Sequence, residues 1–391
     1  MSIWITDTIE SCIDKVIDNR GKNPKNYLTC GQYPVIDNFL IQNEKYPNLC
    51  NVTRYLDKDL FNNFLRNYLE KDDVIITLVG NGIGNVSMSP SADVAIVQNT
   101  IGLRCNNKLL NNFLYYYLLK NNKSIKALDR GGAQPSINKN DVLNSYIYYP
   151  ESIDTQNKIA KVLSNYDDLI ENNNKRIKIL EEMAQKIYKE WFVDFKFPNH
   201  ETATFKQTDL GEIPSDWEVV LVESLLKRLK AKNKYTQDNV ISHGNTIVID
   251  QSTAEFLGFH NNEPDFYANP EKPLIIFGDH TCKMQMLVEN FSIGPNVIPI
   301  TSDTVPIAFL YYLIDSLIET KEYKRHWNDL IAKKVILPTN NLTIYYSKII
   351  TPIMATINHL KHKNMNLKQT RNLLLPRLIS GEIDVENLEI L

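Results

Sequence analysis

Apolar residues recur at alternating steps of four and three over a long stretch in the middle of the chain. This heptad seam consists of Ile159, Leu163, Tyr166, Ile170, Asn173, Ile177, Leu180, Ala184, Ile187 and Trp191. The positions between them are rich in Lys, Glu, Asp and Asn, which is typical of an amphipathic helix with a solvated outer face. A helix of roughly 35 residues would be about 50 Å long at about 1.5 Å per residue. We expect such a helix to pair with a second one.

The C-terminal part of the chain repeats this spacing. Its seam consists of Tyr346, Ile350, Ile353, Ile357, Leu360, Asn364, Leu367, Arg371, Leu374 and Leu378. Proline costs about 3 kcal/mol inside a helix, so Pro352 predicts a helix start or kink and Pro376 an altered last turn. Each seam carries one asparagine, and a polar seam residue fixes register at a cost in stability. The alternative is that each helix packs only on its own globular domain.

Short apolar or alternating runs outside the seams predict β-strands, because Gly, Asn, Asp and Pro bound them. These runs are residues 73–78, 94–97, 147–149, 246–249, 274–277 and 335–337. Residues 111–120 and 306–318 have the length and the aromatic and aliphatic content of short buried helices. Each half of the chain is therefore expected to be a compact α+β domain followed by one long helix. The polar stretch 195–209 is expected to link the two halves.

The chain also repeats itself in sequence. Trp4, Glu10, Ser11 and Val35-Ile36-Asp37 recur 213 positions later as Trp217, Glu223, Ser224 and Val248-Ile249-Asp250. Further along, the offset shrinks to 200 for Ile75-Ile76, 196 for Phe113-Leu114-Tyr115-Tyr116 and 188 for Tyr149-Pro150. Core elements that persist while surface loops shorten give this pattern. It predicts two copies of one module and two similar binding events, although duplication for stability alone is an alternative.

We therefore predict an α+β protein with two tandem domains and two long coiled-coil helices. The predicted boundaries are residues 1–150 for the first domain, 151–195 for the central helix, 196–338 for the linker and second domain, and 339–391 for the distal helix.

Composition narrows the function. A net charge of −3 argues against a protein that coats nucleic acid indiscriminately, because non-specific binding depends on neutralising phosphates. No apolar run approaches the roughly 20 residues of a membrane span and no signal segment begins the chain, so we expect a cytoplasmic protein without membrane contact. The five cysteines are scattered without metal-ligand spacing, which favours reduced thiols over zinc ligands or disulfides.

The search for catalytic motifs is largely negative. In the segment Gly80–Asn85, Asn85 stands where a dinucleotide fingerprint needs glycine, so we interpret the segment as a turn between strands. The Asn-Pro pairs at 23–24 and 269–270 are followed by charged residues and do not form an amino-methyltransferase motif. The seven histidines lack metal-ligand spacing, so no metal is predicted. Ser-His-Asp or Cys-His catalysis has no local signature and stays open.

Polar, turn-rich segments supply the candidate DNA contacts, because Arg, Asn and Gln can bond base edges and backbone N–H groups can hold phosphates. In the first domain the candidates are Arg20, Lys22, Asn23, Lys25, Tyr27, Asn81, Arg130, Gly131, Gly132, Gln134 and Ser136. In the second domain they are Lys230, Lys232 and Lys234, from a run of five cations in eight residues, with Lys283 and Arg325. The alternative interpretations are ordinary polar loops and, for the cation run, a solvated helix end.

Together these features resemble the specificity subunit of type I restriction-modification enzymes. Residues 159–195 resemble that family's central helical region, and Gly211–Trp217 the entry to its second recognition domain. Leu373–Ile383 resembles its distal helix, and Gly131–Ile137 is also a characteristic segment. The resemblance covers essentially the whole chain. It departs in the second domain, which has Lys324-Arg325-His326-Trp327 in place of an Arg-Gly-Gly segment.

The resemblance implies a non-catalytic chain whose two target-recognition domains each read one half of a split, asymmetric DNA sequence. The resemblance also implies that two long antiparallel coiled-coil helices separate the two target-recognition domains, which are related by pseudo-twofold symmetry. These helices would set the number of unread bases and dock two modification (methyltransferase) subunits, which bind S-adenosylmethionine, while this chain itself holds no cofactor. Restriction (motor-nuclease) subunits would complete the complex. The seam residues expected to pair the helices are Leu163, Ile170, Asn173, Ile177, Leu180, Ile187, Ile357, Leu360, Asn364, Leu367 and Leu374. A coiled-coil scaffold without DNA contact and a degenerate DNA methyltransferase are the alternatives.

Overall fold

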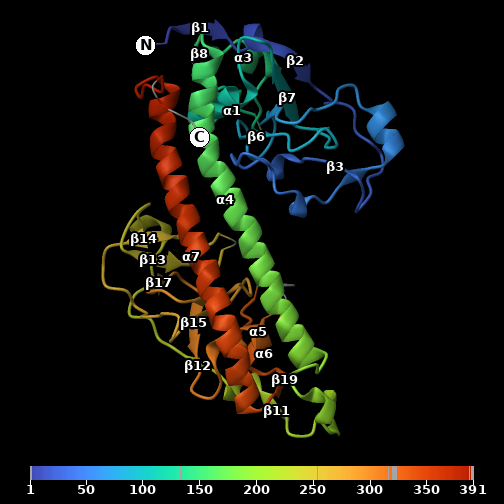
Figure 1. The fold of residues 1–391 in the computed structure, drawn as a ribbon, viewed down its shortest axis with the longest axis vertical. Coiled ribbons are helices and arrows are strands. Elements are labelled where there is room, and N and C mark those ends of the chain that lie inside the picture. The colour runs from blue at the N-terminus through green and yellow to red at the C-terminus, as the bar shows by residue number, and fades with distance from the viewer. Residues whose placement is uncertain are drawn as a thin grey trace. The chain divides into compact units, whose positions relative to one another are not determined.

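The computed structural model describes residues 2–132, 134–252, 254–315, 317–318, 324–386 and 388 (Figure 1). The chain forms two compact units. The first unit is residues 1–172 with 364–391, and the second unit is residues 173–363. Helix α4 (Ile153–Tyr188) begins in the first unit and ends in the second, whereas α7 (Asn340–Ile379) does the reverse. Each unit therefore combines one α+β domain with a segment of both long helices.

The first unit is built on a four-stranded antiparallel sheet. Its strand order is β2 (Ile13–Ile17), β7 (Thr100–Cys105), β5 (Val74–Thr77) and β6 (Val86–Met88). Helix α1 (Asn111–Lys120) packs on this sheet, and α2 (Asn122–Lys126) and α3 (Lys139–Leu143) follow it. Strand β1 (Trp4–Thr8) pairs with β8 (Tyr146–Pro150), and β3 (Tyr33–Pro34) with β4 (Tyr55–Leu56).

The second unit repeats this architecture. Its four-stranded sheet has the order β12 (Lys227–Arg228), β18 (Val297–Thr301), β15 (Leu274–Gly278) and β16 (Met284–Leu287). Helix α5 (Ile307–Ile314) packs on it, and α6 (Trp327–Ile331) follows. Strand β11 (Glu218–Leu221) pairs with β19 (Lys334–Leu337). The remaining strands are β13 (Thr246–Ile249), β14 (Gly258–His260) and β17 (Phe291–Ile293), with the hairpin β9 (Phe205–Thr208) and β10 (Gly211–Pro214).

The internal repeat found in the sequence corresponds to equivalent elements of the two units. The repeated Val-Ile-Asp tripeptide makes a parallel pairing in both: Val35 pairs with Ala95, and Val248 with Ser292. The Phe-Leu-Tyr-Tyr repeats lie in α1 and α5, where Phe113 and Phe309 are fully buried. Two copies of one module is therefore the correct interpretation of the sequence offsets.

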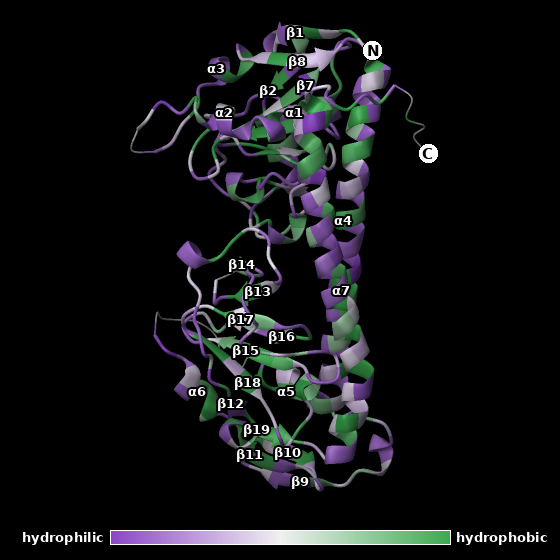
Figure 2. Cartoon of the chain, turned by 90° about the vertical axis from the view of Figure 1, so that its left-hand side faces the viewer, coloured by the Kyte–Doolittle hydropathy of each residue, from purple (hydrophilic) through white to green (hydrophobic). Residues whose placement is uncertain are grey.

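The two long helices pack against each other within both units. In the first unit, Leu163 of α4 shares a core with Leu375 and Leu378 of α7, whereas in the second unit Ile177 meets Ile357 and Leu360. Going from Leu163 to Ile177 along α4, the contacting residues of α7 change from Leu375 and Leu378 to Ile357 and Leu360, so their residue numbers decrease. The two helices are therefore antiparallel. Hydrophobic and hydrophilic residues alternate around both helices (Figure 2). The helices do not pack on their own domains alone.

The predicted seam residues line this pairing. Leu163, Ile170, Asn173, Ile177, Ile357, Leu360 and Asn364 are buried, and Leu180, Ile187, Leu367 and Leu374 are half-buried. Of the half-buried residues, Leu180 packs against Ile177, Ile357 and Leu360, Ile187 against the core of the second unit, and Leu374 against the core of the first. Burial of a leucine or isoleucine side chain stabilises the folded state by about 1.5–3 kcal/mol.

The structure differs from four local predictions. Helix α7 starts at Asn340 and continues through Pro352. Proline has no N–H to donate to the carbonyl of Lys348, four residues earlier. Helix α7 tolerates this loss because both Pro352 and Lys348 are exposed, so water can bind the carbonyl. The expected linker 195–209 contains strand β9 of a hairpin. Residues 94–97 form one isolated bridge instead of a regular strand. The helix expected over 306–318 ends at Ile314, and Ser316 within that range lies outside the described residues.

The segment after α7 closes the core of the first unit. Gly381 follows the helix with φ +76° and lies so close to Trp4 that an added Cβ would be 2.8 Å from its Cε2. Val385 is buried in the same core. In the second unit Trp217 is covered by Phe195 and Phe197, whose ring centroids lie 5.5 and 5.2 Å away. No described helix is long and apolar enough to cross a membrane.

We predict that Gly381→Ala destabilises the chain more than Gly21→Ala does. Both glycines have positive φ, where alanine costs about 1 kcal/mol, but an added Cβ at Gly21 has no atom within 4 Å. At Gly381 the clash of the added Cβ with Trp4 should lower the free energy of unfolding by a further amount of about 1–3 kcal/mol. The measurement is the free energy of unfolding by urea titration of both variants. Equal losses would show that Trp4 does not restrict this site.

Candidate nucleic-acid interface

Two polar loops meet at one edge of the first domain. One joins β5 to β6 (residues 78–85), and the other joins α2 to α3 (residues 127–138). The N–H of Gly80 donates to the carbonyl of Pro135 at 2.9 Å, and the N–H of Ile137 donates to Leu78 at 2.8 Å. The segment Gly80–Asn85 is a turn between antiparallel strands, as predicted.

Two side-chain amides, those of Asn38 and Gln134, lie close to Gly80. The Nδ2 of Asn38 donates to the carbonyl of Asn81 at 3.2 Å. An added Cβ on Gly80, which has φ +87°, would lie 3.3 Å from Asn38 Nδ2 and 3.4 Å from Gln134 Nε2. Asn81 and Gln134 are exposed and Asn38 is half-buried. Amides of this kind can bond the N6 and N7 atoms of adenine, so this cluster suits base reading.

The loop around Arg130 is closed by its own hydrogen bonds. Asp129 Oδ1 accepts from the N–H of Gly131 at 3.3 Å and from that of Ser136 at 2.9 Å, while the Arg130 N–H donates to the Ser136 carbonyl. Gly131 has φ +66° and is exposed together with Gly132. The Arg130 side chain is exposed and forms an ion pair with Asp141 at 2.9 Å. Ala133 within this loop lies outside the described residues.

Helix α3 connects this loop to the Arg20 segment. Lys139 of α3 lies 3.7 Å from Asp18, and Asp18 accepts two bonds from the Arg20 guanidinium at 2.9 and 2.8 Å. Burial alone would raise the pKa of Asp18, but the hydrogen bonds and charge of Arg20 lower it. Arg20 is therefore held in place, and a charge-neutral pair at this position reduces its attraction for phosphate.

The rest of this segment has mixed surroundings. Asn23 and Lys25 are exposed, whereas Lys22 lies 5.1 Å from the ring centroid of Phe64. Tyr27 lies under the Arg54 guanidinium at 4.4 Å, and Arg54 also pairs with Asp37 of the repeated tripeptide. Asn23 and Lys25 are thus the members of this segment that present polar groups to solvent.

The five cations of the second domain separate into two groups. Lys227 pairs with Asp303 at 3.3 Å and Arg228 lies 5.8 Å from the Trp327 ring centroid. Lys230, Lys232 and Lys234 are exposed, and among the described residues they form no ion pair. The segment is strand β12 followed by a loop, so the alternative of a helix end is wrong.

Two further candidates have different surroundings. Lys283 is half-buried, and its Nζ donates to the carbonyls of Asp250 at 3.1 Å and Ala254 at 2.5 Å. Burial lowers the pKa of Lys283. This lysine therefore binds the backbone at Asp250 and at Ala254. Arg325 is 78% exposed at its side chain, 3.8 Å from Asp279, and remains a candidate contact.

Sequence reasoning missed Asn38 and its counterpart. Gln251 stands 213 positions after Asn38, directly after the second Val-Ile-Asp, and its Oε1 accepts from the N–H of His280 at 3.1 Å in the loop between β15 and β16. Both amides thus bind the equivalent hairpin loop of their unit. The signal was present, because each directly follows the repeated tripeptide. No group of three or more potential metal ligands occurs in the part of the chain that the structure describes.

Comparisons with known proteins agree with this architecture. Residues 13–182 match the model of the "Type I restriction modification DNA specificity domain" family. The chain is 26% identical over 337 residues to the type I restriction enzyme MjaIX specificity subunit of Methanocaldococcus jannaschii, covering 77% of each chain. It is 29% identical over 188 residues to the MjaVIII specificity subunit of the same organism, covering 46% of this chain and 42% of that protein. The crystal structure of the type I restriction-modification S subunit from M. genitalium has the same fold, with a TM-score of 0.60, 16% identity and 96% of each chain covered.

The fold is that of a repeated α+β domain with two long helices that run from one unit into the other. Residues 13–182 thus match the type I restriction-modification DNA specificity domain family, and over 77% of its length the chain is similar to a type I restriction enzyme specificity subunit.

We predict that replacing Lys230, Lys232 and Lys234 together by Gln flattens the salt dependence of duplex binding. Each phosphate contact contributes about 0.9 to the slope of log K against log salt, so three lost contacts should reduce the slope by about 2–3. Fluorescence anisotropy of a labelled duplex across a salt titration measures this slope.

The matched control replaces Lys178, Lys186 and Lys189 by Gln. These three lysines pair with acidic residues on or just beyond α4, and their loss changes the net charge equally. The control should leave the slope nearly unchanged. A similar decrease in both variants would mean that net charge, and not this loop, sets the binding.

Proposed function

We propose that each domain of this chain reads one half of a bipartite, asymmetric DNA target. The observation that carries the proposal is that one fold occurs twice with different recognition loops. The β5–β6 loop of the first unit, residues 78–85, carries the exposed Asn81, and Gln134 lies beside its Gly80. The equivalent loop of the second unit spans only residues 279–283. Two domains with the same fold and different loops are suited to binding two different DNA sequences.

The long helices would hold the two readers at a fixed spacing. At about 1.5 Å per residue, the 36 residues of α4 and the 40 residues of α7 correspond to about 54 and 60 Å. Two domains joined by stiff helices lose little freedom when the second half-site is bound, so reading both halves adds specificity at a small extra entropic cost. The number of unread base pairs would then follow from helix length.

The outer faces of the helices would dock the modification subunits. Apolar side chains remain exposed there, with 46% of Leu169, 56% of Ile179 and 48% of Met183 accessible on α4 and 65% of Leu373 on α7. Exposed apolar residues along a helix that is already paired are typical of a further protein interface. We propose two modification subunits per chain, each with its own S-adenosylmethionine, and restriction subunits that join them. The two-domain repeat supports the number two.

Exchanging residues 1–150 for the first domain of another specificity subunit should change one half of the target and leave the other half and the gap unchanged. The reason is that the first domain carries its own sheet and loops. Sequencing of methylated bases in a host that supplies the modification subunits gives both half-sites. The reciprocal exchange of 196–338 is the control and should change the other half, whereas changes in both halves after one exchange would contradict modular reading.

Lengthening both helices should lengthen the gap without altering the half-sites. Insertion of four residues after Asn172 and after Lys363 adds about 6 Å, or about two base pairs, and insertion of seven residues adds about 10 Å, or about three, while keeping the heptad phase. The same methylation sequencing reads the gap. Insertion into one helix only is the control and should reduce methylation, because it misaligns the seam. An unchanged gap in the double insertions would refute the spacer role.

A further inference from the structure

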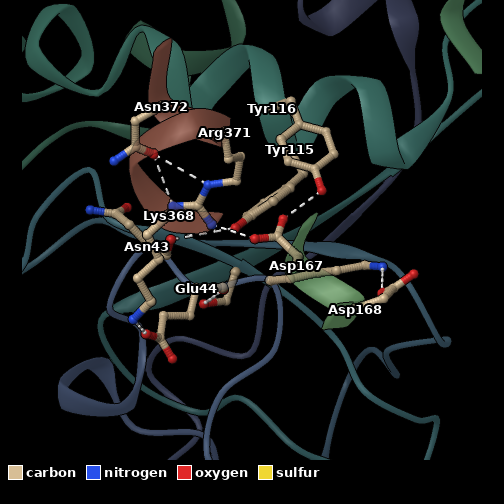
Figure 3. Close-up of polar contacts among 11 residues, drawn as sticks. Asn43, Glu44, Tyr115, Tyr116, Asp167, Asp168, Lys368, Arg371 and Asn372 are labelled. Carbon is tan, nitrogen blue, oxygen red and sulfur yellow. Dashed lines mark hydrogen bonds and ion pairs between the residues drawn. The ribbon is translucent and has the colours of Figure 1, made fainter. Parts of the chain in front are cut away.

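A buried polar triad joins three elements of the first unit (Figure 3). The Tyr116 hydroxyl of α1 donates to Asp167 Oδ2 of α4 at 2.6 Å, and Arg371 Nη1 of α7 donates to Asp167 Oδ1. These residues are 0%, 7% and 8% exposed. Burial raises the pKa of Tyr116, and the Asp167 carboxylate raises it further, so the phenol stays a donor.

The charges around the triad are satisfied locally. Arg371 also donates to Asn372 Oδ1 through Nε at 3.2 Å and Nη2 at 3.0 Å. Next to the triad, two more ion pairs tie the helices to the domain: the exposed pair of Lys368 with Glu44 at 3.0 Å, and the half-buried Lys45 with the exposed Asp168 at 2.7 Å. Asp167 and Arg371 are the most buried charged residues of this group, so they lose the most hydration. The direct bond between them therefore contributes most to offsetting the cost of burying their charges.

The second unit has the same three positions with different chemistry. Alignment of the two seams at Ile159 and Tyr346 sets an offset of 187, which places Met354 at the position of Asp167 and Ala184 at the position of Arg371. The Tyr312 hydroxyl, equivalent to that of Tyr116, contacts Met354 Sδ at 3.4 Å. Ala184 is fully buried. An ion pair in one unit is thus replaced by an apolar contact in the other.

This difference between the units affects the pairing of like helices, meaning the same helix from two copies of the chain. Because the two halves share one fold, α4 of one chain could pair with α4 of a second copy, and α7 with α7. In the α4 pair Asp167 would face Ala184, and in the α7 pair Arg371 would face Met354. Both arrangements bury a charge without its partner, and such a charge costs about 3–5 kcal/mol.

We propose that the Asp167–Arg371 ion pair is a pairing-specificity element. It makes α4 and α7 of one chain each other's partners and disfavours association with a second copy of this chain through like helices. A buried ion pair adds little net stability compared with a well-packed apolar contact. Its effect lies in the penalty on the wrong pairing. The proposal concerns assembly of the chain and does not depend on how DNA is read.

The test uses the full chain with a protease site placed between Asn199 and Ala203, in the exposed segment after α4. Cleavage of the folded protein leaves two halves held together by the helix pairing alone. After dilution and reconcentration to permit exchange, native mass spectrometry counts unlike pairs and like pairs. The wild-type halves should return almost entirely to unlike pairs.

The variant D167M/R371A gives the first unit the residues of the second. It should lower the ratio of unlike to like pairs by at least about tenfold. The contacts at Trp4 and Trp217, which also differ between the units, should preserve part of the preference. The matched control, D168M/K368A, removes neighbouring exposed charges and should keep the wild-type ratio.

Two results would overturn the proposal: wild-type halves that mix freely, or a folded D167M/R371A protein that keeps the wild-type ratio. If D167M/R371A does not fold, A184R/M354D replaces it, because this variant makes the units alike by giving both an ion pair. The same decrease in the ratio is expected for A184R/M354D, and an unchanged ratio again overturns the proposal.

Discussion

Burial of the apolar stripe shared by α4 and α7 is the constraint on which the rest of the structure depends. Neither helix is stable alone in water, since most helical stability in proteins comes from packing of an amphipathic face. Each unit satisfies this need locally and extends it into its domain: Ile159 and Leu163 lie in one core with Phe113, and Tyr346 and Ile350 lie in one core with Phe309. In each unit, helix and domain therefore share one hydrophobic core. The loops at the domain edge lie outside this core, so their sequences can vary while the fold stays stable.

The two units show how one frame carries two different recognition surfaces. The sheets have equivalent strand orders, and the residue after each Val-Ile-Asp holds a hairpin loop by its side-chain amide. The loops themselves differ in length and charge, with an amide cluster in the first unit and exposed lysines in the second. Because the core supplies most of the stability and the loops supply most of the chemistry, a protein of this design can change its target while its fold persists.

The sequence revealed what is periodic or repeated. The heptad seams, the Phe-Leu-Tyr-Tyr helices and the duplicated tryptophan were all visible, because burial imposes spacing on apolar residues. Features that depend on contacts between distant residues were not visible. Lys283 resembled any surface cation until the carbonyls of Asp250 and Ala254 were seen around it, and the hairpin at 205–214 is too polar to show strand alternation. Asp167 directly follows the seam position Tyr166 and therefore resembled the solvated face, although Tyr116 and Arg371 enclose it.

The closure of the first core by Gly381 and Val385 has a consequence for biosynthesis. These two residues are synthesised after all residues of the second unit. Trp4 and the start of α4 are therefore covered only when nearly the entire chain has been translated. The domain that begins to form first is thus completed last, and its apolar surface stays accessible to chaperones throughout translation. A ribosome that stops before residue 364 would release a second unit with all its residues and a first unit without its final helix turns.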